Sequence, residues 1–330
     1  MVGSKTLVFD RPLQGHFRRG VEVVSRVLNA QSRLSMLRHA WPGLITWRGP
    51  LVLNSSNSYL KAFLVIALVR HLLGRRTVGI MTRDPRAYRR LWNTPSPLRA
   101  VLEFVFSRSR VRILSIMVPC ERNAAMGEWI YDIEWWDLKV APLPERATPP
   151  CTVLFLGDVN SSKGLDFFIE AAQAAAAHDR ALIFTLLCDL EELPASAAEA
   201  FQAAGGRILP RTDDDTIFVN HMRHADWIWC CYRPPRDWSS GLFGRALQLG
   251  KRTIVRQGTY IECFQKQYGR GVSIEYGNVE ALLHVLINAG DDKEKPPAPI
   301  AEFSKLSISR LKDACGLQTQ TPEPEAGQES

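Results

Sequence analysis

The sequence predicts an α/β protein with two domains, each built on a doubly wound, mainly parallel β-sheet. Its 330 residues suit two domains. Apolar strand-like segments alternate with helix-like segments through both halves, which is typical of parallel sheets with helices on both faces. The segment 141–150 contains four prolines and interrupts this alternation, because proline neither continues a helix nor fits a central strand.

The domain boundaries follow from this break. We expect a first domain over residues 1–141, a linker over 142–150 and a second domain over 151–290. Residues 291–330 are predicted to form a last helix and a disordered tail, because the end of the chain is polar and rich in proline and glutamate.

Both halves contain apolar runs of strand length and longer segments of helix length. In the first half, strands are expected at 6–9, 43–47, 50–54, 77–81 and 111–118, and helices at 18–30, 58–73 and 98–106. In the second half, strands are expected at 152–156, 181–188, 207–209, 227–232 and 253–255, and helices at 165–177, 194–204, 213–222, 241–250, 279–289 and 300–314. The longest apolar segment, Leu60–Leu73, is shorter than the roughly 20 residues of a membrane span, so no transmembrane helix is expected.

The composition narrows the classes of partner. The formal net charge of +7 suits nucleic acid, an anionic membrane surface or phosphorylated ligands. No nucleic-acid recognition motif accompanies the basic residues, so a nucleic-acid partner is not expected. The seven cysteines lack a CxxC pair and lie partly in apolar runs, which indicates reduced thiols, a cytoplasmic location and no metal site.

Basic residues gather in the first half between Arg70 and Arg112, with aromatic residues such as Tyr88, Trp92 and Phe104 among them. Such a surface favours peripheral contact with the anionic inner face of the cell membrane, where a lipid-linked acceptor would be found. The alternative is a solvated basic surface whose aromatic residues belong to the core.

The first candidate site is the loop Gly157–Gly164, which joins a predicted strand to a predicted helix. Free backbone N–H groups at the helix start, with Lys163 beside them, favour an anion. The alternative is an ordinary strand-to-helix turn with a solvated lysine.

The second candidate site is the start of the predicted helix 241–250. Ser239 or Ser240 suits its N-cap, and Gly241 permits the close approach of a ligand to the backbone. The first turn, which includes Leu242, then presents N–H donors and a positive dipole end to a pyrophosphate. The alternative is a well-capped helix without a ligand.

Four segments of the second half resemble, in order and spacing, the nucleotide-binding domain of the GT-B glycosyltransferases. This family includes glycogen synthases, sucrose synthases and many bacterial polysaccharide glycosyltransferases. The matching segments are 157–164, 225–229, 245–255 and 269–282. The resemblance implies a GT-B-like fold, with two Rossmann-like domains facing across a cleft, and a nucleotide-sugar donor bound by the second domain.

The resemblance also implies roles for single residues. Lys163 matches the family's loop lysine, whereas Asp158 stands where the family has arginine. The family's pair of glutamates falls on Asp237, implied to lie near the donor sugar, and on Arg245. Arginine cannot accept a hydrogen bond from ribose hydroxyls, so Arg245 either leaves ribose to other groups or marks altered donor binding. Glu262 is a weaker match to a further donor-side glutamate.

The first half matches the family poorly, as acceptor domains do. His16 follows the first predicted strand, where this fold has a glycine-rich turn that faces the cleft. A histidine there is a candidate to bind the acceptor sugar or to act as a base, because its pKa lies near neutrality. The alternative is a structural or surface histidine.

These observations predict a glycosyltransferase, of the hexosyltransferase type, that moves a sugar from a nucleotide-sugar donor to a glycan or lipid-linked acceptor in polysaccharide or glycoconjugate synthesis. No cofactor and no metal are expected, since Lys163 and backbone N–H groups can hold the diphosphate charge. One alternative is a sugar-nucleotide epimerase on the same fold. Another is a non-catalytic GT-B partner subunit, for which Asp158 and Arg245 are the evidence.

Overall fold

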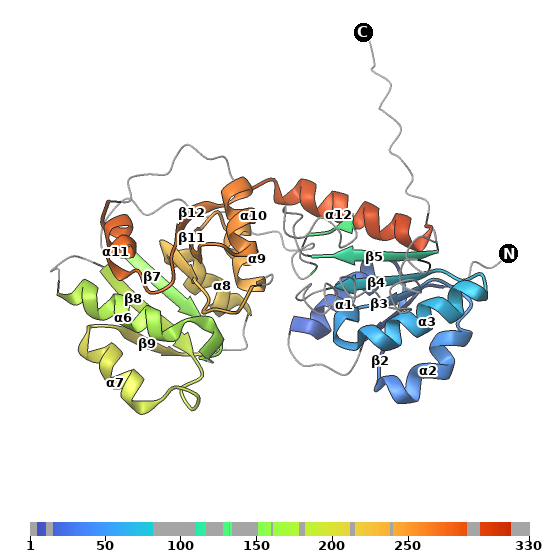
Figure 1. Cartoon of the computed structure of the whole chain (residues 1–330), viewed down its shortest axis with the longest axis horizontal. Coiled ribbons are helices and arrows are strands. Elements are labelled where there is room, and N and C mark those ends of the chain that lie inside the picture. Colours follow the sequence, from blue (N-terminus) through green and yellow to red (C-terminus); the bar gives the residue numbers. More distant parts are fainter. Residues whose placement is uncertain are drawn as a thin grey trace, which may run out of the picture. The chain divides into compact units, whose positions relative to one another are not determined.

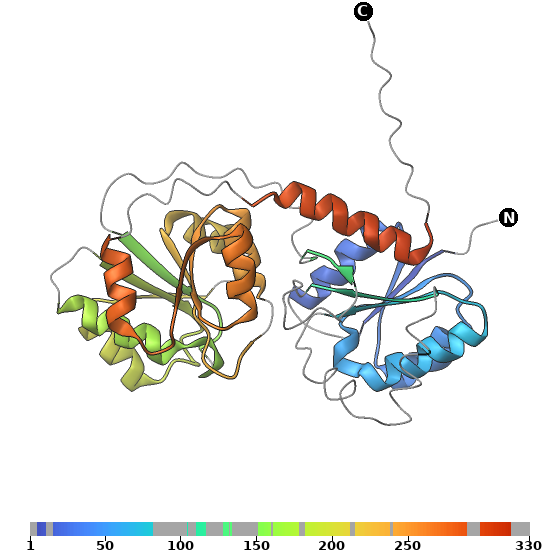
Figure 2. The same cartoon turned by 45° about the horizontal axis from the view of Figure 1, so that its top comes forward.

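The computed structural model consists of two compact α/β units, each with one parallel sheet (Figures 1 and 2). The first unit is Met1–Asp137 together with Ala301–Ser330, and the second unit is Leu138–Ile300. The structure describes residues 5–10, 16–81, 104, 110–116, 128–131, 133, 151–159, 161–177, 182–211, 215–237, 240–288 and 298–317. The predicted linker 142–150, and most of the predicted helix 98–106 and of the tail, lie outside these residues. The predicted fold class is confirmed.

The sheet of the first unit has the order β2-β1-β3-β4-β5-β6, and every pair of neighbours is parallel. Its strands are β1 (Leu7–Asp10), β2 (Gln31–Leu34), β3 (Leu51–Leu53), β4 (Thr77–Met81), β5 (Val111–Ser115) and β6 (Glu128–Trp129). Its helices are α1 (His16–Val27), α2 (Leu37–Thr46), α3 (Leu60–Leu72) and α12 (Ile300–Cys315), with the short 3-10 turn η1 (Ser56–Tyr59) before α3. The helices α2 and α3 cover one face of the sheet and α12 covers the other (Figures 1 and 2).

Three elements of the first unit differ from the prediction, and one of them is the short strand β6, which was not expected. The strand expected at 43–47 is wrong, because these residues fall in or directly after α2, whose Ala40 and Leu44 are buried against the core. Tertiary burial here outweighs the poor helix propensity of the proline and glycine inside α2. The strand β2 was missed because all four of its residues are exposed, so it lacks the apolar pattern of a strand.

Arg70, on α3, is a buried structural residue of the first unit. Its side chain is fully buried, and Nε donates to Thr77 Oγ1 at 3.0 Å. Its two terminal nitrogens donate to four backbone carbonyls, those of Leu44, Trp47, Gly49 and Arg76. Burial, and then the charge of Arg75, lower the pKa of Arg70 to about 10. Arg70 therefore ties α3 to α2 and β4 and takes no part in the basic surface expected there.

The helix α12 belongs to the first unit, although it follows the second unit in the chain. Ser307 Oγ accepts a hydrogen bond from Tyr131 N at 2.7 Å, and the Phe303 ring packs against Trp129 and Tyr131. The predicted helix 300–314 is confirmed, and its contacts extend the core of the first unit beyond β6.

The sheet of the second unit has the order β12-β11-β10-β7-β8-β9 and is also parallel throughout. Its strands are β7 (Cys151–Leu156), β8 (Leu182–Cys188), β9 (Arg207–Pro210), β10 (Trp227–Cys230), β11 (Arg252–Arg256) and β12 (Arg270–Ile274). Its helices are α6 (Leu165–Ala176), α7 (Ala195–Ala203), α8 (Asp215–His224), α9 (Gly241–Gln248), α10 (Tyr260–Tyr268) and α11 (Val279–Asn288), with the 3-10 turn η3 (Ser161–Lys163) before α6. All predicted elements of this half are confirmed within a few residues.

The helix α10 and the strand β12 were missed. No helix or strand was expected between residues 255 and 279. Gly271 serves close strand packing: with φ of 118°, it lies in β12 so near β11 that a Cβ atom would stand 2.1 Å from the Thr253 carbonyl oxygen. Only glycine fits this position, so the glycine marks a sheet contact.

The core of the second unit is aromatic. The Phe168 ring, on α6, contacts the rings of Phe155, Phe184, Phe201 and Trp229 at centroid distances of 5.1–5.5 Å. This packing holds α6, and the loop that precedes it, against the middle of the sheet. Across the described parts of both units, no helix is long and apolar enough to cross a membrane.

Candidate functional site

The second sheet changes direction between β7 and β10. From β7 the chain continues outward to β8 and β9, and from β10 it continues the other way, to β11 and β12. The loops that follow β7 and β10 therefore diverge and leave space at the carboxyl ends of these strands, where ligands of doubly wound sheets bind. Both predicted candidate sites begin here, one in each loop.

Hydrogen bonds join the two loops. Arg233 N donates to Ser162 O at 3.1 Å, and Arg236 Nη1 donates to Ser162 Oγ at 3.1 Å. Gly164, with φ of 77°, lies so close to the other loop that a Cβ atom would stand 2.4 Å from Cys231 O. Gly164 is therefore required for the contact between the loops and for the turn into α6.

Lys163 and Arg236 place two cations on one aromatic ring at this switch point. Lys163 Nζ lies 5.3 Å from the centroid of the Tyr232 ring, and Arg236 Cζ lies 4.3 Å from it. Burial, followed by the charge of Arg236, lowers the pKa of Lys163 to about 8. Gly157 lies beside the ammonium, since a Cβ atom there would make an ordinary contact with Nζ at 3.8 Å. Such a pair of crowded cations favours an anionic ligand.

Asp158 faces a different cation. Its carboxylate accepts a hydrogen bond at 2.5 Å from Arg211, which follows β9, and both side chains are about half exposed. The arginine that the family pattern places at 158 is absent, and Arg211 brings a guanidinium to the same edge of the sheet instead. Arg211 was not predicted as a site residue, because nothing in the local pattern connects it with the loop after β7.

The predicted start of the second helix is confirmed at Ser240. Ser240 Oγ accepts a hydrogen bond from Phe243 N at 3.3 Å and is also hydrogen-bonded to the Tyr232 hydroxyl at 2.5 Å. Gly241 and Leu242 follow Ser240 in the first turn of α9. Ser239 lies outside the described residues. Arg245 is buried inside α9, and its predicted part in donor binding remains a prediction.

The loop after β10 is held by β11 and α10. Asp237 Oδ1 accepts a hydrogen bond from Tyr260 N at 2.7 Å, so it ties the loop to the start of α10. Arg256, the last residue of β11, donates from Nε to Tyr232 O and from Nη2 to Arg236 O, both at 2.7 Å. Arg256 thus holds the backbone of Tyr232, which carries the aromatic ring, and of Arg236, which carries the second cation.

Sequence reasoning overlooked Arg236 and Arg256 as site residues. A signal was present for Arg236, since it follows an apolar strand at the end where ligands of parallel sheets bind. Arg256 gave no such signal, because its hydrogen bonds to the neighbouring loop depend on the parallel pairing of β10 with β11.

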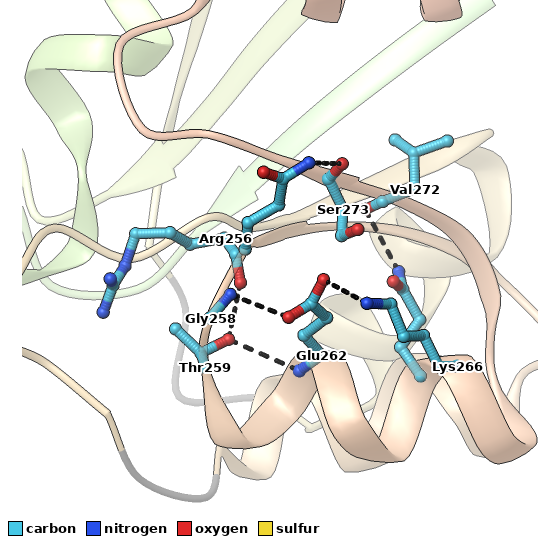
Figure 3. Close-up of polar contacts among 9 residues, drawn as sticks. Arg256, Gly258, Thr259, Glu262, Lys266, Val272 and Ser273 are labelled. Atoms are coloured by element: carbon cyan, nitrogen blue, oxygen red, sulfur yellow. Dashed lines mark hydrogen bonds and ion pairs between the residues drawn. The ribbon is translucent and has the colours of Figure 1, made fainter.

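Glu262 lies in a capping arrangement at the start of α10 (Figure 3). Thr259 Oγ1 accepts a hydrogen bond from Glu262 N, while Glu262 Oε2 accepts one from Gly258 N at 2.7 Å and Oε1 pairs with Lys266 Nζ at 2.8 Å. Burial raises the pKa of Glu262, but the hydrogen bonds from Lys266, Gly258 and Ser273 outweigh it and hold the pKa below its usual value. This carboxylate stabilises the helix start. Its predicted donor-side role remains a prediction.

His16 is the first residue of α1, in the first unit, and follows β1 as predicted. Its side chain is not among those described. The acceptor-side role of His16 remains a prediction.

The comparison with solved structures agrees with this fold. A glycosyltransferase from Rickettsia africae matches with a TM-score of 0.60 at 11% identity, covering 96% of this chain and 95% of that one. HepE from Anabaena, solved with UDP and glucose, matches with a TM-score of 0.56 at 12% identity over 95% of this chain and 97% of its own. A Listeria monocytogenes protein described as a candidate UDP-N-acetylglucosamine 2-epimerase matches with a TM-score of 0.59 at 11% identity over 97% and 98% of the two chains.

No protein-family model matches the chain, and no curated protein sequence matches it significantly. The structural likenesses extend over nearly the whole of each chain, so they show the fold of both units. The chain has the two-domain, Rossmann-like GT-B fold that the sequence predicts.

Proposed function

We propose that this protein is a glycosyltransferase that binds a nucleotide-sugar at the β7/β10 switch point of the second unit. The observation that carries the proposal is the placement of Lys163 and Arg236 on the Tyr232 ring, beside the first turn of α9. A nucleoside diphosphate would bring its negative charge next to both cations. Three neighbours at this level of structural similarity are described as a glycosyltransferase, a protein bound to UDP and glucose, and a candidate sugar-nucleotide epimerase.

The proposed chemistry follows from the charge that develops during transfer. When the bond between the sugar and the diphosphate breaks, negative charge grows on the departing diphosphate. The Lys163 ammonium, the Arg236 guanidinium and the N–H groups of Gly241 and Leu242 stabilise that charge without reorganising. In this proposal no metal ion takes part, because the two cations and the helix start supply positive charge at the diphosphate.

Two further residues complete the proposal. Asp237 Oδ2 has no hydrogen-bond partner among the described residues, and we assign it the position facing the donor sugar. His16 serves as the acceptor-side base on the first unit. The acceptor is a glycan or a lipid-linked sugar, so the reaction belongs to polysaccharide or glycoconjugate synthesis, at the inner face of the cell membrane where the acceptor is lipid-linked.

Nucleotide binding tests the donor site. Thermal shift and calorimetry with UDP, GDP, ADP, TDP and CMP are expected to reveal one preferred nucleotide, which at 100 times its Kd stabilises the protein by about 2.7 kcal/mol. The Lys163→Ala variant is expected to lose this binding. Lys305→Ala is the matched control, because Lys305 is an exposed lysine on α12 in the first unit. Failure of every nucleotide to bind overturns the proposal.

Two alternatives predict different outcomes. An epimerase, which the Listeria likeness favours, turns over a nucleotide-sugar without any acceptor. A non-catalytic partner subunit, which the buried Arg245 and the acidic Asp158 favour, binds nucleotide weakly and turns over nothing. Product analysis of UDP-sugars incubated with the protein, with and without acceptor, separates the three.

A further inference from the structure

The first sheet has a switch point of its own, between β1 and β3. From β1 the chain goes outward to β2 and then returns to β3, on the other side of β1. Asp10 is the last residue of β1, and Asn54 directly follows β3. Asn54 Nδ2 donates a hydrogen bond to Asp10 Oδ2 at 2.9 Å, and the two residues are only 2% and 1% exposed. A polar pair is thus buried where a doubly wound sheet binds ligands.

Two polar atoms at this point have no hydrogen-bond partner within the part of the chain that the structure describes. They are Asn54 Oδ1 and Ser55 Oγ, and Ser55 is fully buried. The next hydroxyl along the chain, Ser56 Oγ, donates to Ile80 O at 3.0 Å. A serine hydroxyl in this turn can therefore be hydrogen-bonded within the protein. Buried polar groups are nearly always hydrogen-bonded, and the exceptions require an explanation.

Ser55 also has a strained backbone. Its φ and ψ of 49° and 35° lie in the left-handed region, which serine rarely adopts. Glycine at this position would remove both the strain and the unsatisfied hydroxyl. Strain of this kind persists at functional sites, where the side chain has a use that outweighs its cost to stability.

We propose that Asn54 Oδ1 and Ser55 Oγ bind hydroxyl groups of a saccharide at the β1/β3 switch point. Asn54 Oδ1 can only accept a hydrogen bond, so the ligand must supply donors. The buried Asp10 carboxylate beside it disfavours a phosphate, which brings further acceptors and negative charge. The choice of a saccharide rests on the proposed function.

Saturation-transfer NMR on the full-length protein tests this site, with glucose, N-acetylglucosamine and glucose 6-phosphate as probes. We expect binding of at least one neutral sugar and weaker binding of glucose 6-phosphate. Ser55→Ala and Ser55→Gly are each expected to weaken the neutral sugar about tenfold, the effect of losing one hydrogen bond. The glycine variant is expected to keep or raise the Tm. The proposal is overturned if neither neutral sugar binds, or if both variants bind as tightly as the wild type.

Two control variants separate the hydroxyl from the backbone. Asn29→Gly relieves a left-handed residue with φ of 48°, exposed in the turn after α1, and is expected to leave sugar binding unchanged. Ser56→Ala removes a satisfied hydroxyl, so it is expected to lower the Tm without changing sugar affinity. An equal loss of sugar binding in Ser56→Ala assigns the effect to the turn as a whole and overturns the proposal.

The same samples keep this inference distinct from the donor-site proposal. Lys163→Ala is expected to lose nucleotide binding and keep sugar binding, while Ser55→Gly is expected to weaken sugar binding about tenfold and keep nucleotide binding. If the wild type binds a neutral sugar but no nucleotide, the donor proposal fails and the saccharide site stands. If it binds a nucleotide but no neutral sugar, the saccharide site fails alone.

Discussion

The ammonium of Lys163 lies 5.3 Å from the centre of the Tyr232 ring. The backbone carbonyl of Tyr232 accepts a hydrogen bond from Arg256. The ring offers the cation only a weak, quadrupolar partner. Burial and the nearby Arg236 guanidinium make the charged form of Lys163 costly, and the pKa falls from 10.5 to about 8. The folded protein therefore keeps a destabilised cation at the β7/β10 switch point, which an anionic ligand would relieve.

Replacing Lys163 by methionine is expected to raise the stability of the protein at pH 7. The folded pKa lies below the unfolded one, so the unfolded chain binds more protons between about pH 8 and 10.5, and wild-type stability rises with pH across this window. The shift corresponds to roughly 3 kcal/mol at most. Urea unfolding of wild type and Lys163→Met at pH 7 and pH 10 measures it.

The gain is expected to shrink as the pH approaches 10, because wild-type Lys163 is then neutral when folded. The exposed Lys305→Met variant is the control and is expected to show no such pH-dependent gain. A lower stability of Lys163→Met at pH 7 would show that the ammonium stabilises the unliganded fold, which contradicts the prediction.

Replacing Arg256 by methionine is expected to weaken nucleotide binding without removing any group that touches the ligand. Its guanidinium holds the carbonyls of Tyr232 and Arg236, so its loss frees the loop that presents both side chains. Hydrogen bonds from a charged donor contribute about 1.5–3 kcal/mol. If the nucleotide has to order the loop when it binds to the variant, a cost of this size corresponds to a tenfold or greater rise in Kd. Calorimetry with the preferred nucleotide measures it.

The matched control is Arg207→Met, since Arg207 is an exposed arginine at the beginning of β9, away from the carboxyl ends of the strands. A Kd that stays the same in Arg256→Met, together with a lower Tm, would mean that Arg256 is structural only. Partial recovery by Arg256→Lys is not expected, because lysine cannot span two carbonyls in the fixed geometry of a guanidinium.

Replacing Glu262 by glutamine is expected to reduce the loss of stability that the protein shows as the pH falls below about 4.5. The folded pKa of Glu262 is lower than 4.5, so its contribution is present above about pH 4.5 and is lost as the pH falls through the folded pKa. At pH 7 the variant is expected to lose about 1 kcal/mol, the usual value of a helix cap. Thermal unfolding between pH 3 and pH 7 measures it, with the exposed Glu170→Gln, on α6, as control. A constant difference across this range contradicts the prediction.

The sequence predicted those parts of the site that depend on local chain geometry. Gly164 and Ser240 were found because a turn into a helix requires a glycine or a capping hydroxyl at a fixed offset. Arg211 and Arg256 were missed because they reach the site from strands far away in the sequence, and only the parallel order of the strands brings them to it.

The same distinction explains the errors in the fold. Strands with an apolar run were predicted within a few residues, whereas the exposed β2 carries no apolar signal. The local sequence of residues 43–47 is typical of a strand. These residues nevertheless form a helix, because the helix buries Leu44 in the core. Local pattern thus predicts an element where it agrees with tertiary packing, and fails where packing overrides it.

Replacing Arg70 by methionine is expected to destabilise the first unit severely. Methionine fills a similar volume, but Thr77 Oγ1 and the carbonyls of Leu44, Trp47 and Gly49 lose the guanidinium as donor, while Arg76 O keeps the hydrogen bond from Leu51 N. Since each buried acceptor without a partner costs about 1–3 kcal/mol, we expect a loss of at least about 3 kcal/mol. Urea unfolding measures this loss, and the exposed Arg48→Met is the control. Nucleotide binding belongs to the second unit and is expected to persist in any folded Arg70→Met protein. A loss below about 1 kcal/mol would show that the carbonyls find other donors once the guanidinium is gone.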